Sequence, residues 1–205
     1  MADLIKEGKL DEEILNESVR RVLYVKFKMG LFEDPYGERY AHCKMHPQEG
    51  VQLSKEIADE SVILLKNENG LLPLNAEKLK SVAVIGPNAD QVQFGDYTWS
   101  RNNKDGVTPL AGIRQLLGDK VTVHYEKGCS LVSLDTSGIK KAVEVARQSE
   151  VAIVFCGSAS AALARDYKSS TCGEGFDLND LNLTGAQSQL IKEVYETGTP
   201  VVLVL

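Results

Sequence analysis

Apolar residues recur at helical spacing in two stretches near the N-terminus. In the first, a stripe of apolar side chains follows Asp11, a residue type that favours the N-cap of a helix. The stripe consists of Leu15, Val19, Val22, Leu23 and Phe27. This helix is expected to end at Gly30, because glycine readily adopts the left-handed conformation that often follows a helix. The second stretch, roughly residues 48–66, predicts another amphipathic helix that ends before the turn signal Asn69–Gly70.

From about residue 80 the pattern changes to short β-branched runs that alternate with helical segments. The four runs are Val82–Ile85, Val121–Tyr125, Val151–Cys156 and Val201–Leu205. The helical segments between them cover residues 109–117, 137–149 and 184–197. Nearly continuous apolar strands that alternate with helices are typical of a parallel sheet. The predicted fold class is therefore α/β, a doubly wound, mostly parallel sheet with helices on both faces.

The same patterns divide the chain into three regions. Residues 33–47 are polar, contain two prolines and show no periodicity, so they are predicted to be a linker. We expect a helical unit at 1–32, a linker with a bridging helix at 33–79, and an α/β domain at 80–205. The last strand would lack a covering helix and the first helix would lack a partner for its stripe. We therefore expect the sequence to be a piece of a longer protein.

Composition narrows the possible functions. The 205 residues are 43% hydrophobic and carry a formal net charge of -6. A negative charge gives no attraction to nucleic acid or to an anionic membrane, and the apolar runs are much shorter than the about 20 residues of a membrane span. The N-terminus has no basic segment followed by an apolar one, as a signal peptide would. The four cysteines and three histidines show no metal-ligand spacing, so no metal site is expected. No cofactor is implied either.

One long segment offers candidate chemistry. Nucleotide-binding glycine motifs and the serine-hydrolase Gly-x-Ser-x-Gly motif do not occur in the sequence. Residues 157–183 follow a predicted strand without periodicity, and ligands of parallel α/β sheets bind outside the carboxyl ends of strands. In this segment the glycines on either side of Glu174 can present its carboxylate at a tight apex, beside the apolar surface of Phe176. From the chemistry alone, Glu174 could also be a solvated loop residue. Three rival acids lie in the same segment, namely Asp166, Asp177 and Asp180.

Several segments, in order and at plausible spacing, carry a family resemblance. They are Glu17–Leu23 with Lys28–Phe32, Ser61–Asn67 with Gly70–Leu74, Val84–Asp90 with Gly95–Tyr97, and Gly173–Asp177 with Asp180–Leu183 and Gly185–Gln187. Together they resemble glycoside hydrolase family 3, the β-glucosidase and β-xylosidase group, over nearly the whole chain. The resemblance implies that residues 1–32 end in the last helix of a truncated (β/α)₈ barrel. It also implies that 80–205 belong to the α/β sandwich domain that follows this barrel, truncated at its C-terminus.

The resemblance further implies a retaining reaction with two carboxylates. An aspartate of the barrel attacks the anomeric carbon, while a glutamate of the second domain protonates the leaving oxygen and then activates water. Glu174 matches this acid/base position, and Phe176 is a candidate substrate-binding residue. The nucleophile would lie outside the sequence, so the fragment alone is expected to be inactive. The parent would hydrolyse terminal β-D-glucosides or β-D-xylosides, either β-linked oligosaccharides or aryl glycosides, and this piece would pack on the missing barrel.

Two positions depart from the family pattern. Members commonly carry arginine where Leu178 stands, so the loop is expected to be held differently here. Members also commonly carry proline at Thr184; here Thr184 and Gln187 have the spacing of a capping box, which would start the last helix in its place.

Two other classes of function remain open at this point. One is a non-catalytic α/β module that binds a carbohydrate or a nucleotide. The other is an interaction module that docks through the Leu15–Phe27 stripe. The preference between glucose and xylose and the compartment stay open, although members of this family are often periplasmic or secreted.

Overall fold

The computed structural model describes residues 1–43, 48–95, 97–98, 106–160 and 168–205. The chain divides into two compact units, Met1–Lys66 and Asn67–Leu205, which are described separately. Among the described residues, none of the helices has the length and apolar character that crossing a membrane requires. The boundaries predicted after residues 32 and 79 stay predictions.

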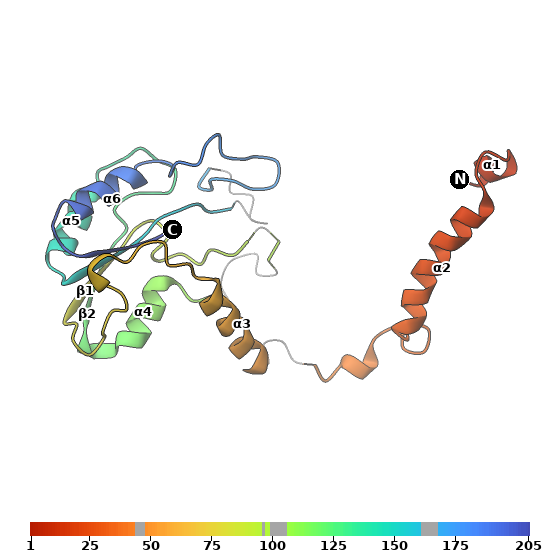
Figure 1. The fold of residues 1–205 in the computed structure, drawn as a ribbon, viewed down its shortest axis with the longest axis horizontal. Coiled ribbons are helices and arrows are strands. Elements are labelled where there is room, and N and C mark those ends of the chain that lie inside the picture. The colour runs from red at the N-terminus through yellow and green to blue at the C-terminus, as the bar shows by residue number, and fades with distance from the viewer. Residues whose placement is uncertain (44–47, 96, 99–105, 161–167) are drawn as a thin grey trace. The chain divides into compact units, whose positions relative to one another are not determined.

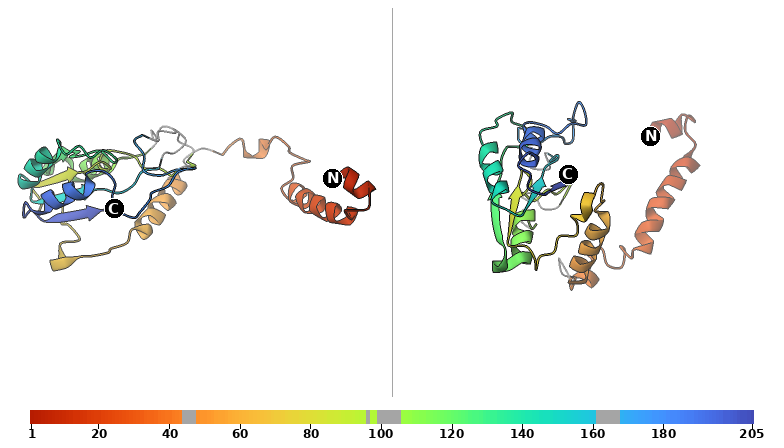
Figure 2. Two further views of the ribbon diagram at one scale, coloured as in Figure 1. Left: turned by 90° about the horizontal axis from the view of Figure 1, so that it is seen from above. Right: turned by 60° about the vertical axis from the view of Figure 1, so that its left-hand side comes forward.

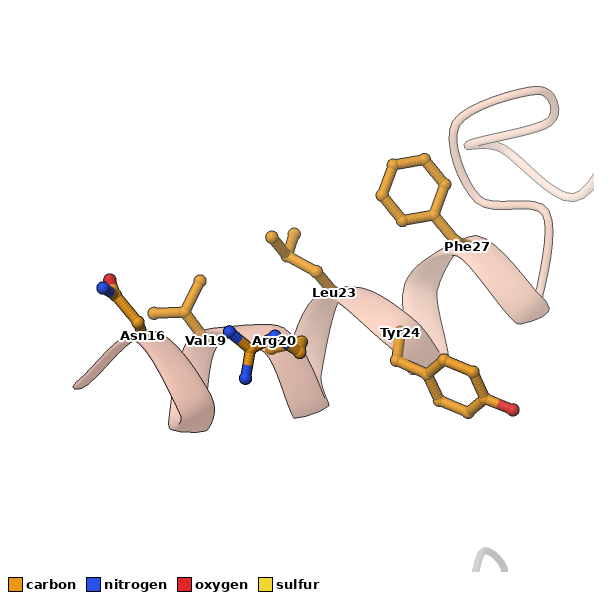
Figure 3. Close-up of a pocket in the computed structure, with 6 residues that line it drawn as sticks. All are labelled: Asn16, Val19, Arg20, Leu23, Tyr24 and Phe27. Carbon is orange, nitrogen blue, oxygen red and sulfur yellow. The ribbon is translucent and has the colours of Figure 1, made fainter. Parts of the chain in front are cut away.

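In the first unit, the short helix α1 (Ala2–Lys6) precedes α2 (Glu12–Lys28). Helix α2 begins where the sequence predicts, because the Asp11 side chain accepts a hydrogen bond from the backbone N–H of Glu13 at 3.0 Å. Figure 3 shows its apolar side chains along the helix, where they line a hollow on the helix surface. The lining residues are Asn16, Val19, Arg20, Leu23, Tyr24 and Phe27. All six side chains are exposed.

The segment after α2 has local structure of its own. The carboxylate of Asp34 accepts hydrogen bonds from the backbone N–H groups of Arg39 and Glu38, at 3.1 and 2.9 Å, and pairs with the Arg39 guanidinium at 3.3 Å. The Arg39 backbone bond, followed by that of Glu38, lowers the pKa of Asp34. These contacts hold a 3₁₀ turn, η1 (Glu38–Tyr40), so part of the predicted linker is organised around one carboxylate.

Helix α3 (Gln48–Ser61) ends five residues earlier than the pattern predicts, so the predicted end at residue 66 is wrong. The residues that follow, Val62–Leu65, are not helical and are exposed. Val62 and Ile63 are β-branched and lose side-chain freedom in a helix. The Ser61 hydroxyl, which donates to the Ala58 carbonyl at 2.8 Å, also satisfies an acceptor that the next turn would use.

The second unit contains the predicted sheet. After a 3₁₀ turn, η2 (Glu68–Gly70), come β1 (Ser81–Ile85), α4 (Pro109–Leu117), the turn η3 (Gly118–Lys120), β2 (Thr122–Glu126), α5 (Ile139–Arg147), β3 (Val151–Phe155), α6 (Gln187–Tyr195) and β4 (Val201–Val204). The strand order is β2-β1-β3-β4 and every pairing is parallel. This confirms the α/β fold class, with α5 and α6 a few residues shorter than predicted.

Helices cover the two faces of this sheet. Figure 1 shows α5 and α6 on one face and α4 on the other, and Figure 2 gives two further views of the layers. Alternate residues of β1 explain the two cores. Ala83 and Ile85 pack in a cluster with residues of α5 and α6, whereas Val82 and Val84 pack with Leu110 of α4. Because β1 is buried on both faces, its sequence is continuously apolar rather than alternating.

The reactivity of the cysteine thiols tests whether this core is closed to solvent. Cys156, which directly follows β3, is 3% exposed, and burial raises its pKa to about 12, with the nearby Cys129 adding to the effect. Burial also raises the pKa of Cys129. With a pKa of about 12, about one Cys156 thiol in ten thousand is ionised at pH 8. Only the thiolate reacts with an alkylating reagent, so this thiol is expected to be inert. We expect iodoacetamide at pH 8 to modify the exposed Cys43 and to leave Cys129 and Cys156 unmodified until urea unfolds the protein. Mass spectrometry of the modified peptides gives the result, and modification of Cys156 at the rate of Cys43 would contradict it.

Candidate active site

The carboxyl ends of β1 and β3 lie side by side in the centre of the sheet. The chain leaves β1 toward α4 on one face and leaves β3 toward α6 on the other, which is the arrangement that opens a ligand crevice in parallel α/β sheets. Gly86 follows β1 with φ +118°, and a side chain there would place its Cβ 2.1 Å from the Phe155 carbonyl oxygen. That carbonyl accepts a hydrogen bond from the backbone N–H of Asn88 at 3.3 Å. The exits of the two central strands are therefore held close together.

The loop between β3 and α6 is pinned to itself near its start. The buried Thr171 donates its backbone N–H to the Ala159 carbonyl at 2.8 Å. Its hydroxyl accepts from the Ala159 N–H at 3.0 Å and donates to the Ala159 carbonyl at 3.1 Å. Ser160 and Cys172 pair next to it as an isolated parallel bridge. We call these contacts between Ala159 and Thr171 the loop crosslink. Residues 161–167, and with them the rival acid Asp166, lie outside the described part of the chain.

Two residues beyond the crosslink the chain reverses in a tight hairpin turn. The Phe176 N–H donates to the Gly173 carbonyl at 3.2 Å, and the Gly173 N–H donates to the Phe176 carbonyl at 3.0 Å. Glu174 and Gly175 are the two central residues. Gly175 has φ +89°, which a type II turn requires at its third position and which favours glycine. The structure thus has the tight apex that the two glycines predict.

This hairpin places Glu174 and Phe176 at the same turn. Glu174 is exposed, and Phe176 is half-buried. Of the rival acids, Asp177 and Asp180 are also exposed, and Asp180 uses its carboxylate in a local turn, where it accepts from the Asn182 N–H at 2.7 Å. Nowhere in the described part of the chain do three or more His, Cys, Asp or Glu side chains lie together as a metal would need. The turn therefore offers an exposed carboxylate, with an aromatic side chain two residues further along the chain.

The predicted capping box at the end of this loop is wrong. Helix α6 begins at Gln187 rather than near Thr184, because Gly185 has φ +61° and interrupts the helical backbone. The Thr184 hydroxyl donates to the Leu131 carbonyl at 2.6 Å instead of capping α6. The Gln187 side chain bonds Gly157 and Leu131, which are 30 and 56 residues away in the sequence. No local pattern could have revealed these partners.

Comparison with known proteins places this arrangement in a family. A model of the glycosyl hydrolase family 3 C-terminal domain matches residues 62–205. The beta-xylosidase of Formosa agariphila is 32% identical over 100% of this chain and 28% of its own length. The periplasmic beta-glucosidase of Salmonella typhimurium is 34% identical over 98% of this chain and 29% of its own length.

Solved structures agree with the sequence relatives. The crystal structure of beta-glucosidase from Listeria innocua in complex with isofagomine matches 99% of this chain and 27% of its own, with a TM-score of 0.79 and 29% identity. The chain spans less than a third of the length of these relatives. On the family model and on these relatives, the chain belongs to glycosyl hydrolase family 3.

Proposed function

We propose that this chain is the acid/base portion of a retaining glycoside hydrolase that acts on terminal β-glucosides or β-xylosides. Glu174 is the general acid/base in this proposal. The observation that carries it is the glycine-bounded turn that exposes this carboxylate on the loop that leaves the carboxyl end of β3, in a chain of family 3. Relatives of this chain are named for both sugars, which supports the two substrate classes together.

The geometry suits the two proton transfers of a retaining reaction. Glu174 donates a proton to the leaving oxygen while the first bond breaks, and its carboxylate then takes a proton from the attacking water. An exposed apex lets this carboxylate reach a sugar that another domain holds. The half-buried Phe176 provides an apolar surface next to it on which a sugar ring can lie.

A second carboxylate must complete the reaction. A retaining mechanism requires it about 5–5.5 Å from the first, as the nucleophile. We propose that this aspartate belongs to a barrel outside residues 1–205, and that the exposed apolar stripe of α2 packs against the same barrel. The isolated chain then lacks the group that attacks the anomeric carbon.

Activity assays on two proteins test this proposal. The complete protein that contains this chain is expected to release the aryl group from an aryl β-glucoside or an aryl β-xyloside, and proton NMR should show the β-anomer as the first product. Residues 1–205 alone are expected to show no turnover of either substrate. Turnover by the isolated chain, or the α-anomer from the complete protein, would overturn the proposal. Tight binding of a nucleotide in calorimetry, without hydrolysis, would favour a binding module instead.

A further inference from the structure

The Gln187 side chain is polar, completely buried and placed between two distant parts of the chain. Its carbonyl oxygen Oε1 accepts from the Gly157 N–H at 2.9 Å, and its Nε2 donates to the Gly157 carbonyl at 3.0 Å. The carboxamide therefore bonds both backbone groups of one residue, as a neighbouring strand would. Gly157 stands two residues beyond the end of β3, so this side chain pairs with the chain just past the strand.

The same amide nitrogen reaches the other end of the loop. Nε2 lies 3.2 Å from the Leu131 and Thr184 carbonyl oxygens and 3.3 Å from the Thr184 hydroxyl. An amide group has two hydrogens, so these acceptors and Gly157 share them in three-centre bonds. Gly157 opens the loop that carries Glu174, and Thr184 closes it. We call this set of contacts around Gln187 the loop neck.

A second observation connects the neck to the hairpin. The loop crosslink between Ala159 and Thr171 lies two residues past Gly157 on one side and two residues before Gly173 on the other. Neck and crosslink are both buried or half-buried, so water competes weakly for their hydrogen bonds. A continuous path of bonded backbone then runs from the sheet to the turn that presents Glu174.

We infer that Gln187 is a positioning residue for Glu174, which it holds through the neck and the crosslink. The catalytic purpose of this positioning rests on the proposed function of Glu174. The hydrogen-bonded connection between Gln187 and the hairpin can be measured without any substrate. Loss of the carboxamide would leave the Gly157 N–H and carbonyl without their partner inside the protein. The loop would then open at its base while the sheet stays folded.

Hydrogen exchange measured by NMR on the 205-residue chain tests the connection. The variant Gln187→Met replaces the amide with a side chain of similar length that has no amide. Amide exchange at Gly157, Ala159 and Thr171 is then expected to become about tenfold to a hundredfold faster, because buried hydrogen bonds are lost. Amides of β1 and β3 should change no more than in Gln189→Met. Gln189 is the matched control, because it is exposed on the same helix and its amide donates to Glu193 one turn further along. Unchanged exchange at Ala159 and Thr171, or an equal rise throughout the sheet, would overturn the inference.

A measurement on the unaltered protein tests the same contacts if the Gln187→Met variant does not fold. The side-chain NH₂ of Gln187 is expected to exchange at least about tenfold more slowly than that of Gln189, because only the first is buried and bonded to carbonyl groups. Equal exchange rates of the two side chains would show that the Gln187 amide does not make the hydrogen bonds of the loop neck.

Kinetics of the complete protein separate positioning from a general structural defect. Gln187→Met is expected to lower kcat/KM, which reports the first step, about tenfold for an alkyl glycoside, whose leaving group needs a proton, and much less for a dinitrophenyl glycoside, whose leaving group does not. An equal loss for both substrates would mean a structural role alone. If Glu174→Gln itself shows no dependence on the leaving group, the proposed function fails, whereas the exchange data still decide whether Gln187 closes the loop.

Discussion

Replacing Glu174 with glutamine in the complete protein is expected to lower kcat for an alkyl β-glycoside by about 10²–10⁴-fold, the usual contribution of a general acid/base. Glutamine keeps the size of the side chain and the turn around it, because the hairpin bonds join Gly173 and Phe176 and do not involve the carboxylate. The loss therefore reports on proton transfer rather than on folding. Dinitrophenolate departs without needing a proton, so the first step for a dinitrophenyl glycoside should be nearly unaffected. The second step, in which Glu174 takes a proton from water, should slow.

Azide and two matched variants show whether the lost activity is that of an acid/base carboxylate and whether it belongs to Glu174. Azide attacks the glycosyl intermediate without a base, so it should restore turnover of the dinitrophenyl glycoside and yield the β-glycosyl azide. Asp177→Asn and Asp180→Asn are the controls, since both acids lie on the same loop. A small effect of Glu174→Gln together with a large loss in either control would move the acid/base role to another carboxylate.

Gly86→Ala is expected to destabilise the chain by about 2–6 kcal/mol, the sum of a strained backbone and a forced displacement in a packed site. Gly86 has φ +118°, and the new Cβ would lie 2.1 Å from the carbonyl oxygen of Phe155. That oxygen belongs to the backbone of β3 and cannot rotate away as a side chain could. Urea unfolding followed by circular dichroism gives the change in the free energy of unfolding.

Gly198→Ala is the control for this variant. Gly198 has φ +79°, but a Cβ added there would meet no heavy atom within 4 Å, so alanine strains the backbone without a clash. Both variants lose the same flexibility in the unfolded chain, so that contribution cancels in the comparison. If Gly86→Ala were no less stable than Gly198→Ala, close contact between the exits of β1 and β3 would not be a constraint on the fold. The comparison also bears on function, because a displaced Phe155 carbonyl moves the start of the loop that carries Glu174.

The elements that local patterns predicted well are those whose signal lies within a few consecutive residues. All four strands were located to within a residue or so, because each is a short β-branched run between helical segments. The two central strands, β1 and β3, give the clearest signal, since burial on both faces makes them almost continuously apolar. The start of α2 followed from a single side chain, Asp11, that bonds a backbone group two residues away. The turn at Glu174 followed from the glycines beside it. Its role as acid/base remains a proposal, because the partner carboxylate would come from outside the chain.

The sequence-based predictions were wrong where a side chain bonds residues that are distant in sequence, or where two local preferences conflict. Helix α3 ends at Ser61 although the apolar periodicity continues beyond it. Thr184 and Gln187 have the spacing of a capping box, but their side chains bond Leu131 and Gly157 instead. The energy of those bonds depends on burial, which the spacing of two residues does not reveal.

By itself, the sequence determined the order of strands and helices, the two-sided burial of the sheet and the glycine turn at Glu174, since all of these arise from backbone preferences and periodicity over a few residues. Only the tertiary structure decided that β3 follows β1 in the sheet, that Gly86 lies against Phe155, and that Gln187 closes the loop carrying the candidate acid. These features depend on chain segments that meet only after folding, where close packing and buried hydrogen bonds select among arrangements that the local pattern leaves equivalent.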